Sequence, residues 1–230
     1  MHLECRNIQF YYPGTEKLVL NDLNLEFSEP GFHAFFGPSG VGKTSLARLI
    51  TGETQQAAGQ IHFDGLGKLF YAYNLERLPD WSNVGRHLER ITPAHNIRQK
   101  EDLVAAFGLS AIMRQRFSQL SLGQQNRINL VRYLVQDFDL LIMDESLANV
   151  DEKTRGNILV AIKKMFPRTV FIYISHNVME VAKFCRHIWV LRSVHKTPQA
   201  VAVRGQDYCQ EGPLDQQALQ QTMLEMMHVA

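Results

Sequence analysis

The chain has 230 residues, of which 45% are hydrophobic and 20% are charged, and its formal net charge is +1 at pH 7. This length accommodates one large α/β domain, or one domain with a small lobe. The near-neutral charge offers no general attraction to nucleic acid, so we expect no nucleic-acid partner. The cysteines are few and isolated, and no apolar run is long enough to cross a bilayer. We therefore expect a soluble protein of the reducing cytoplasm.

The first third of the chain is typical of β-strands. Apolar and polar residues alternate over residues 3–12 and 18–27, which predicts two antiparallel strands joined by a turn at Pro13-Gly14. An apolar run over 32–36 precedes a glycine-rich turn and a helix over 45–50. Short strands are expected over 60–64 and 68–73.

The pattern then becomes mostly helical, and later alternates between helices and strands. We predict helices over 84–91 and 100–107, from about Ser121, and over 152–165, 178–184 and 215–227. Strands are predicted over 138–143, 169–174, 187–192 and 200–203. The runs 138–143 and 169–174 are almost wholly apolar, which is typical of strands buried on both faces.

The turn after the third predicted strand carries the strongest motif. Residues 37–44 fit the phosphate-binding pattern G-x-x-x-x-G-K-[ST], between a strand and a helix. Its glycines let backbone N–H groups point inward, and the helix N-terminus adds partial positive charge. Lys43 would reach the β- and γ-phosphates of a nucleotide, and the Thr44 hydroxyl would ligate Mg²⁺. The predicted nucleotide-binding residues, with the next residue of the helix, are Gly37, Pro38, Ser39, Gly40, Val41, Gly42, Lys43, Thr44 and Ser45.

Two later strands end in groups that can act on a phosphate. The strand over 138–143 runs into Asp144 and Glu145. In a strand beside the phosphate loop, Asp144 would lie near the Mg²⁺, and Glu145 could polarise a water for attack on the γ-phosphate. His176 follows the strand over 169–174. A lone histidine is more often a packed or solvated residue, but its place at a strand end makes it a candidate.

Residues 120–127, Leu-Ser-Leu-Gly-Gln-Gln-Asn-Arg, resemble the signature motif of ATP-binding cassette (ABC) ATPases, usually Leu-Ser-Gly-Gly-Gln followed by Gln-x-Arg. The other motifs occur in the family's order. Tyr12 resembles the aromatic that stacks on adenine, residues 146–151 resemble the loop that ends in aspartate, and His176 resembles the switch histidine. The resemblance implies an α/β core, an antiparallel β lobe and a helical lobe over about 75–135, all within one cassette domain of residues 1–230.

The resemblance also implies roles for the site residues. Two ATP molecules would be held between two cassettes, so the chain needs a second cassette, either a copy of itself or a related subunit. The signature of one cassette would contact the ATP of the other, and Asp151 would lie at the dimer contact. The implied catalytic residues are Lys43, Glu145 and His176, the implied Mg²⁺ site is Thr44, Asp144 and Asn74, and the implied signature residues are Ser121, Leu122, Gly123 and Gln124.

The chain departs from the family pattern in two places. Leu122 replaces the first signature glycine, which would cost free energy if that position needs a positive φ angle. The family usually has a glutamine after the strand over 68–73, where this chain has Tyr73-Asn74. Asn74 carries the same amide on a shorter stem, so we favour it over Tyr73 as the replacement.

These features favour the ATP-hydrolysing subunit of a transporter, peripheral on the inner face of the cell membrane and acting through separate permease subunits. The stretch around Trp81 resembles the permease-contacting groove of import-type (taurine-, nitrate- or thiamine-like) cassettes, although Trp81 could instead be packed inside the helical lobe. Met223, Met226 and Met227 could form a docking face, but a helix packed on its own core is the simpler interpretation. The alternatives are a soluble ABC ATPase outside transport, or a nucleotide-binding subunit with weak hydrolysis.

Overall fold

The computed structural model describes residues 1–12, 14–74, 76, 82–210 and 212–230. Its strands form two sheets. The antiparallel three-stranded sheet has the order β2 (Leu18–Phe27), β1 (His2–Tyr11), β4 (Ala58–Asp64). The six-stranded sheet has the order β5 (Leu69–Tyr73), β6 (Leu140–Asp144), β7 (Val170–Ile174), β3 (Gly31–Phe36), β8 (His187–Leu191), β9 (Ala200–Arg204). Its strands pair in parallel except for β9, which runs antiparallel to β8.

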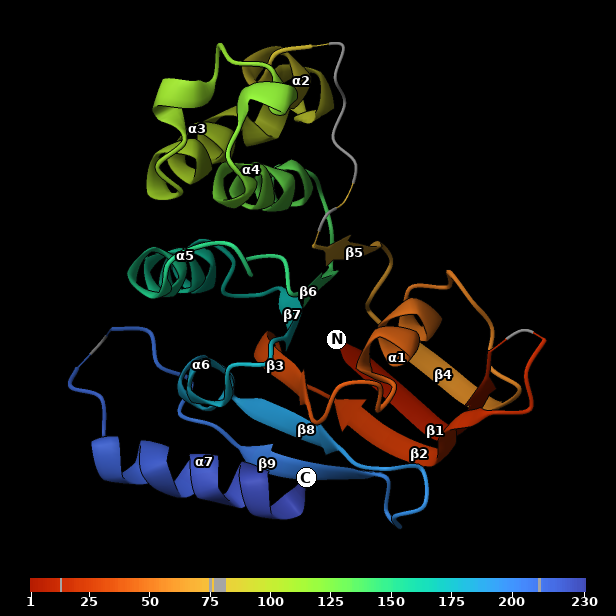
Figure 1. Ribbon diagram of the computed structural model, residues 1–230. Helices are drawn as coiled ribbons and strands as arrows, with labels where there is room; N and C mark the ends of the chain where they lie inside the picture. The colour runs from red at the N-terminus through yellow and green to blue at the C-terminus, as the bar shows by residue number, and fades with distance from the viewer. Residues whose placement is uncertain (13, 75, 77–81, 211) are drawn as a thin grey trace.

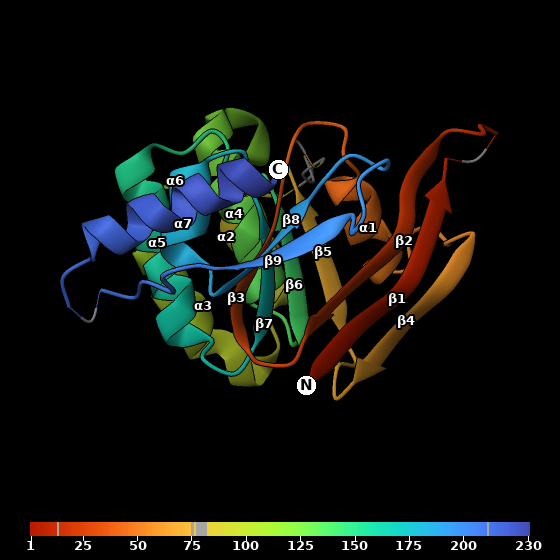
Figure 2. The same ribbon diagram turned by 90° about the horizontal axis from the view of Figure 1, so that it is seen from below.

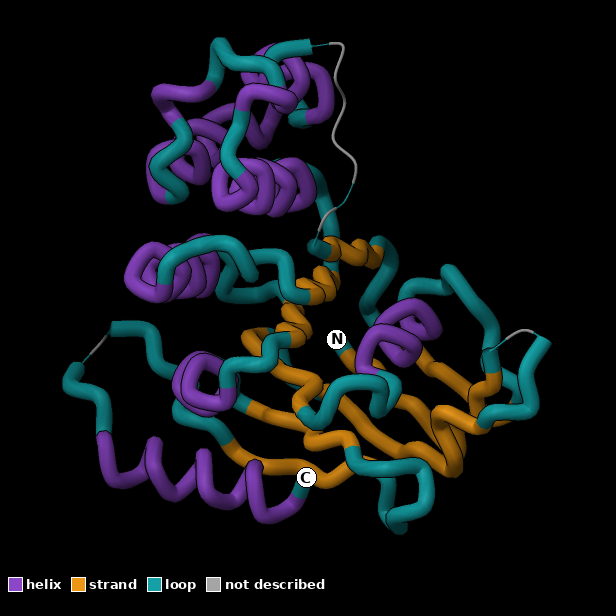
Figure 3. The backbone as a smooth tube through the Cα atoms, viewed as in Figure 1, coloured by secondary structure: helices purple, strands orange, loops and turns teal. Residues whose placement is uncertain are grey.

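The α-helices are grouped around these sheets: α1 (Lys43–Ile50), α2 (Val84–Ile91), α3 (Ile97–Ala106), α4 (Leu122–Leu134), α5 (Glu152–Met165), α6 (Val178–Phe184) and α7 (Gln216–Val229). Figure 1 shows α2, α3 and α4 gathered in an upper lobe above the strands, with α4 nearest to β5. Seen from below, α5, α6 and α7 lie on one side of the six-stranded sheet, and α1 and the three-stranded sheet lie on the other (Figure 2). The upper lobe is built of helices and connecting loops, whereas the strands lie below it (Figure 3).

The central strands are apolar because both of their faces are covered. In β6, Leu141 and Met143 join the core shared with the helices, whereas Leu140 and Ile142 join the core shared with α1 and the three-stranded sheet. All five residues of β6 and of β7 are buried. This burial on both faces explains the nearly continuous apolar runs that predicted these strands.

Most of these helices begin where the sequence supplies a capping side chain, whereas α1 and α3 have no side-chain cap. The side chains of Asn83, Ser121, Asp151, Asn177 and Asp215 accept a hydrogen bond from a backbone N–H in the first turn of α2, α4, α5, α6 and α7 respectively. Such caps satisfy N–H groups that have no partner inside the helix. The predicted bounds of α2, α5 and α6 are therefore confirmed to the residue.

Other boundaries differ from the predictions. β6 begins at Leu140 rather than at residue 138, and the Asp139 carboxylate just before it accepts hydrogen bonds from the N–H groups of Gly67 and Lys68. α1 begins at Lys43 and α3 at Ile97, earlier than predicted. Trp81 lies outside the described residues. None of the helices in the described part of the chain is long and apolar enough to cross a membrane.

Candidate nucleotide-binding site

The glycine-rich turn lies between β3 and α1, and its glycines are required by geometry. Gly37, Gly40 and Gly42 have φ angles of 139°, 78° and 109°, which side chains rarely permit. A Cβ atom on Gly37 would lie 2.3 Å from the Leu191 carbonyl oxygen, and one on Gly42 would lie 2.8 Å from Leu20 Cδ2. The β8 backbone therefore leaves space only for glycine at position 37, whereas at position 42 a side chain would crowd Leu20 and would also be strained by the φ angle.

Lys43 is the first residue of α1 and is buried, with 7% of its surface exposed. Its Nζ donates hydrogen bonds to the carbonyl oxygens of Gly37 (2.7 Å) and Pro38 (2.8 Å). Burial lowers the pKa of this ammonium group. The charges of the Asp144 and Glu145 carboxylates raise it, but by less than burial lowers it. A cation held among carbonyl groups, beside the positive end of a helix, is suited to binding phosphate.

Asp144, at the end of β6, lies beside the phosphate loop as predicted. One of its oxygens, Oδ2, accepts hydrogen bonds from the Thr44 hydroxyl (2.7 Å) and the Tyr71 hydroxyl (2.8 Å). Burial, followed by the Asp144 charge, raises the pKa of Tyr71, which keeps its hydroxyl a donor. No cluster of three or more His, Cys, Asp and Glu side chains suited to a metal exists among the described residues. A hydroxyl and a carboxylate side by side nevertheless fit Mg²⁺, which usually takes one or two protein ligands and completes its shell with phosphate oxygens and water.

Glu145 and His176 lie against each other. His176 Nε2 contacts Glu145 Oε1, which joins the residue that follows β6 to the segment that follows β7. Glu145 has a φ angle of 50°, a left-handed conformation that is strained for a residue with a side chain. Its backbone N–H donates to the carbonyl oxygen of Ile174 (3.0 Å), so β7 holds this turn in place.

A cavity of about 250 Å³ brings most of the predicted site residues together. Tyr12 lines it and its hydroxyl lies 2.8 Å from Ser45 Oγ, and its stacking on adenine stays a prediction. The residues around this cavity come from segments far apart in the chain: Tyr12, Ser39, Gly40, Gly42, Lys43, Thr44, Ser45, Asp144, Glu145, Ile174 and His176.

The signature residues lie elsewhere, at the start of α4. Ser121 caps this helix, and its N–H donates to Gln124 Oε1 (2.9 Å). Leu122 is its first residue and is absent from the residues with positive φ angles, so the strain expected from replacing glycine does not arise. A Cβ atom on Gly123 would lie 2.5 Å from the Asn149 carbonyl oxygen, so this second glycine is required by contact with the loop before Asp151.

Asp151 and Asn74 are also outside this cavity. Asp151 caps α5, and the hydrogen bond from the Thr154 N–H lowers the pKa of its carboxyl group. Asn74 Oδ1 accepts a hydrogen bond from Asn126 Nδ2 of α4 (3.1 Å), and its backbone N–H donates to the Asp144 carbonyl. The role of Asn74 toward Mg²⁺ stays a prediction.

Sequence reasoning missed Tyr71 as a site residue. Its signal is the two-residue period of β5, since alternate side chains of a strand share a face. β5 pairs with β6 in parallel, with Tyr73 opposite Asp144. Tyr71 is two residues before Tyr73 and so lies on the same face of β5, where its hydroxyl meets this carboxylate. The contact could be anticipated only once the two strands were known to be neighbours.

A profile of the ABC transporter family matches residues 20–148. The taurine import ATP-binding protein TauB of Pseudomonas putida is 32% identical over 193 residues, which cover 77% of this chain and 73% of that protein. The molybdenum import ATP-binding protein ModC of Saccharophagus degradans is 30% identical over 85% of this chain. The glycine betaine uptake system ATP-binding protein YehX of Escherichia coli is 30% identical over 76% of this chain. This chain spans 62% and 63% of the latter two proteins, less than two thirds of their length.

Solved structures with a similar fold include a bacterial Atm1-family ABC exporter with ATP bound, with a TM-score of 0.79 at 19% identity. That similarity covers 99% of this chain and 41% of the exporter chain. A dimeric ATP-binding cassette in a post-hydrolysis state, bound to ADP and phosphate, gives a TM-score of 0.74 at 20% identity over 88% of this chain and 99% of that one. At these identities the two structures bear on the fold, and the predicted α/β cassette fold is confirmed.

Proposed function

This chain belongs to the ABC transporter family, as an ATP-binding and ATP-hydrolysing subunit, and we propose specific roles for its residues in that reaction. The observation that carries the proposal is the cavity in which Lys43, Thr44, Asp144, Glu145 and His176 meet. The loop N–H groups and Lys43 would bind the β- and γ-phosphates. Tyr12 would contact the adenine.

Thr44 and Asp144 would hold Mg²⁺, because their oxygens are adjacent and hard cations prefer oxygen ligands. When bound, Mg²⁺ would neutralise charge on the phosphate oxygens. Asn74, whose amide oxygen is hydrogen-bonded to α4, is the proposed further contact to this ion.

Glu145 would orient the attacking water and receive its proton. The water oxygen would form a bond to the γ-phosphorus as the bond to the bridging oxygen breaks, leaving ADP and phosphate. His176 would keep the Glu145 carboxylate in place through the contact between its Nε2 and the carboxylate. Positioning of this kind provides most of the rate enhancement in phosphoryl transfer.

Residues 1–230 would form one cassette, with a helical lobe over about 75–135 that carries the signature. The cavity lining includes no signature residue of the same chain, which supports a site completed by a second cassette. ATP would favour the closed pair by binding it more tightly than the open one, and hydrolysis would release the pair. Ser121 and Gly123 would then face the partner's ATP, and Asp151 would lie at the dimer contact.

The relatives named above are import proteins for three different substrates, which supports an import system without fixing the substrate. We propose that the pair of cassettes works on the inner face of the membrane through separate permease subunits. The proposed permease contact near Trp81 falls outside the described residues.

The test compares Glu145→Gln with the parent protein in ATP binding and in phosphate release. We expect phosphate release to fall about 100-fold or more, because general-base catalysis contributes roughly that factor, while ATP still binds. Glu152→Gln is the matched control, since Glu152 is an exposed acid of the first turn of α5. Equal phosphate release by Glu145→Gln and the parent would contradict the role of Glu145, and release near background by both would favour a nucleotide-binding subunit with weak hydrolysis.

A further inference from the structure

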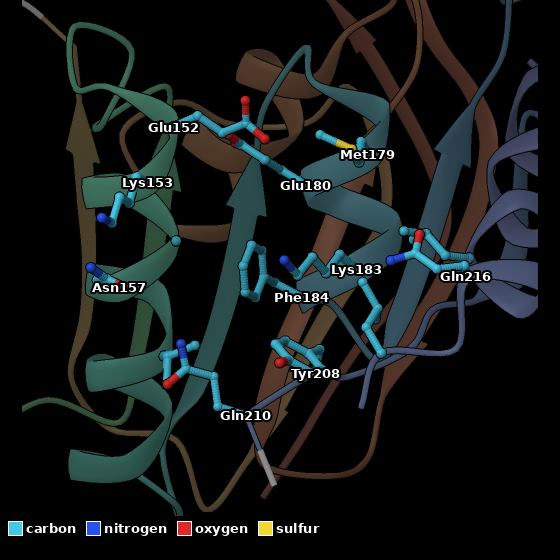
Figure 4. Close-up of a pocket in the computed structure, with 14 residues that line it drawn as sticks. Glu152, Lys153, Asn157, Met179, Glu180, Lys183, Phe184, Tyr208, Gln210 and Gln216 are labelled. Atoms are coloured by element: carbon cyan, nitrogen blue, oxygen red, sulfur yellow. The ribbon is translucent and has the colours of Figure 1, made fainter. Parts of the chain in front are cut away.

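A buried carboxylate lies between α5 and α6, outside the nucleotide cavity. Glu180 is 3% exposed, and its Oε2 accepts a hydrogen bond from the Tyr173 hydroxyl (3.0 Å). The Ser175 hydroxyl lies 3.5 Å from the same oxygen, and Oε1 forms an ion pair with Arg155 of α5. Figure 4 shows Glu180 at the edge of a groove of about 520 Å³, with its side chain directed from α6 toward α5.

Each partner of Glu180 belongs to a segment that carries a residue of the reaction. Tyr173 and Ser175 lie in the stretch that leads from β7 to His176. Arg155 lies one turn after Asp151, and its Nη1 donates to the Leu147 carbonyl oxygen (3.3 Å) in the loop that begins at Glu145. The Glu180 carboxylate therefore joins the Glu145 loop, through Arg155, to the His176 segment.

The Glu145 turn needs such support. A residue with a side chain in the left-handed conformation, as Glu145 is, keeps it only when its surroundings determine it. The Ile174 carbonyl holds the Glu145 N–H from one side, and Arg155 holds the following residues through Leu147. The ion pair with Glu180 in turn holds the Arg155 side chain. Both partners are largely buried, with 16% of the Arg155 side chain and 4% of the Glu180 side chain exposed.

We propose that Glu180 and Arg155 are positioning residues that hold Glu145 and His176 in the mutual arrangement needed for hydrolysis. Neither residue lines the nucleotide cavity, so they act through the two segments that they join. This inference rests on the roles proposed above for Glu145 and His176. It predicts an effect on turnover without an effect on ATP binding, which depends on the phosphate loop.

The experiment measures ATP affinity with a fluorescent nucleotide and the steady-state rate of phosphate release, in Glu180→Gln and Arg155→Met. We expect kcat to fall about tenfold or more in each, because misplacing a reacting group by 1 Å can cost up to about 100-fold. ATP affinity should stay within about twofold of the parent, since the phosphate-loop contacts are unchanged. The double variant should be little worse than either single variant, because residues that act as one unit are not additive.

The same helix provides matched controls. Lys163 of α5 forms a second partly buried ion pair, with Asp207, and its Nζ also donates to the Phe184 and Tyr208 carbonyl oxygens. Lys163→Met and Asp207→Asn break this pair far along α5 from the Glu145 loop. They should lower thermal stability as the test variants do, but leave kcat within about twofold, since a structural cost alone does not move the reacting groups.

Three outcomes would overturn the inference: an unchanged kcat in a folded Glu180→Gln, an equal loss of kcat in Asp207→Asn, or a loss of ATP affinity that accounts for the whole effect. If Glu180→Gln does not fold, Tyr173→Phe takes its place. Tyr173→Phe removes one hydrogen-bond donor to the Glu180 carboxylate and keeps the Arg155 ion pair. It should therefore lower kcat by less, about threefold. An unchanged kcat in that variant counts equally against the inference. Glu145→Gln, measured alongside, separates the two proposals, because full activity in it would instead remove the role of Glu145.

Discussion

Hydrogen-bond donors from two other segments hold the Asp144 side chain in place. Thr44 of the phosphate loop and Tyr71 of β5 donate to the same carboxylate oxygen. Asp144 is 8% exposed, so these hydrogen bonds compensate for water lost on burial. Both donors contact Oδ2, and neither of them contacts Oδ1, the other oxygen of this carboxylate.

We predict that Tyr71→Phe destabilises the protein by about 1–2 kcal/mol, because it removes a hydrogen bond to a charged group in a buried place. It should also raise the Mg²⁺ concentration needed for half-maximal hydrolysis, since Asp144 loses one of its two restraints. Urea unfolding and a Mg²⁺ titration of phosphate release measure the two effects. Tyr73→Phe is the control because Tyr73 is 40% exposed, and an equal loss in it would contradict the role of Tyr71.

At this scale the sequence predicted contacts between residues that belong to motifs and missed contacts made by residues outside them. Thr44 and Asp144 are 100 positions apart but each belongs to a recognisable pattern, so their meeting could be predicted. Tyr71 and Glu180 belong to no motif, and their partners are set by which strands and helices are neighbours. The left-handed backbone of Glu145 likewise depends on the neighbouring β7, which its own sequence does not encode.

The phosphate loop shows how neighbouring elements decide which of its glycines are essential. Gly37 and Gly40 both have positive φ angles, so either would be strained by a side chain. They differ in space, because a Cβ on Gly37 would meet the β8 backbone and one on Gly40 would meet nothing within 4 Å. The motif pattern requires Gly37 and leaves position 40 open, and the packing explains this difference.

We predict that Gly40→Ala costs about 1–2 kcal/mol, the typical penalty of a left-handed residue with a side chain. Gly37→Ala should cost clearly more, about 3 kcal/mol or above, because the loop must also move away from Leu191. It should weaken ATP binding as well, since the same loop binds the phosphates. Chemical unfolding and nucleotide titration test this, and equal unfolding free energies for the two variants would contradict the packing argument.

Element boundaries were predictable where a local side chain sets them. Asp151 and Asn177 start α5 and α6 where the capping pattern indicates. β6 was placed too early because residue 138 continues the apolar run, while the Asp139 carboxylate is engaged by the backbone of Gly67 and Lys68. That contact joins segments more than 70 positions apart and has no local signal.

Across the whole molecule, the signature end of α4 is supported by the loop that follows Glu145. Gly123 lies so close to the Asn149 carbonyl that a Cβ would be 2.5 Å from it. In a pair of cassettes, the group offered to the partner's ATP would therefore rest on the loop of the chain's own site. Asn126 of the same helix donates to Asn74 beside Asp144, which adds a second contact between α4 and this region.

If the signature completes the partner's site, two inactive variants should complement each other when mixed. Lys43→Met removes the phosphate-binding cation and keeps the signature, whereas Ser121→Arg places a bulky side chain at the α4 N-terminus and keeps Lys43. Each variant alone should release almost no phosphate. An equal mixture should recover about a quarter of the parental activity, because half of the pairs are mixed and each mixed pair has one complete site.

The control for that mixture is a chain that carries both changes. Mixed with either single variant, it forms no complete site, because no pair then combines Lys43 of one chain with Ser121 of the other. Recovery in this control would mean that something other than the partner's signature restores activity, and full activity of Ser121→Arg alone would mean that Ser121 serves neither site. A mixture that stays inactive, while size-exclusion chromatography in ATP still detects pairs, would show that the signature does not serve the partner's site.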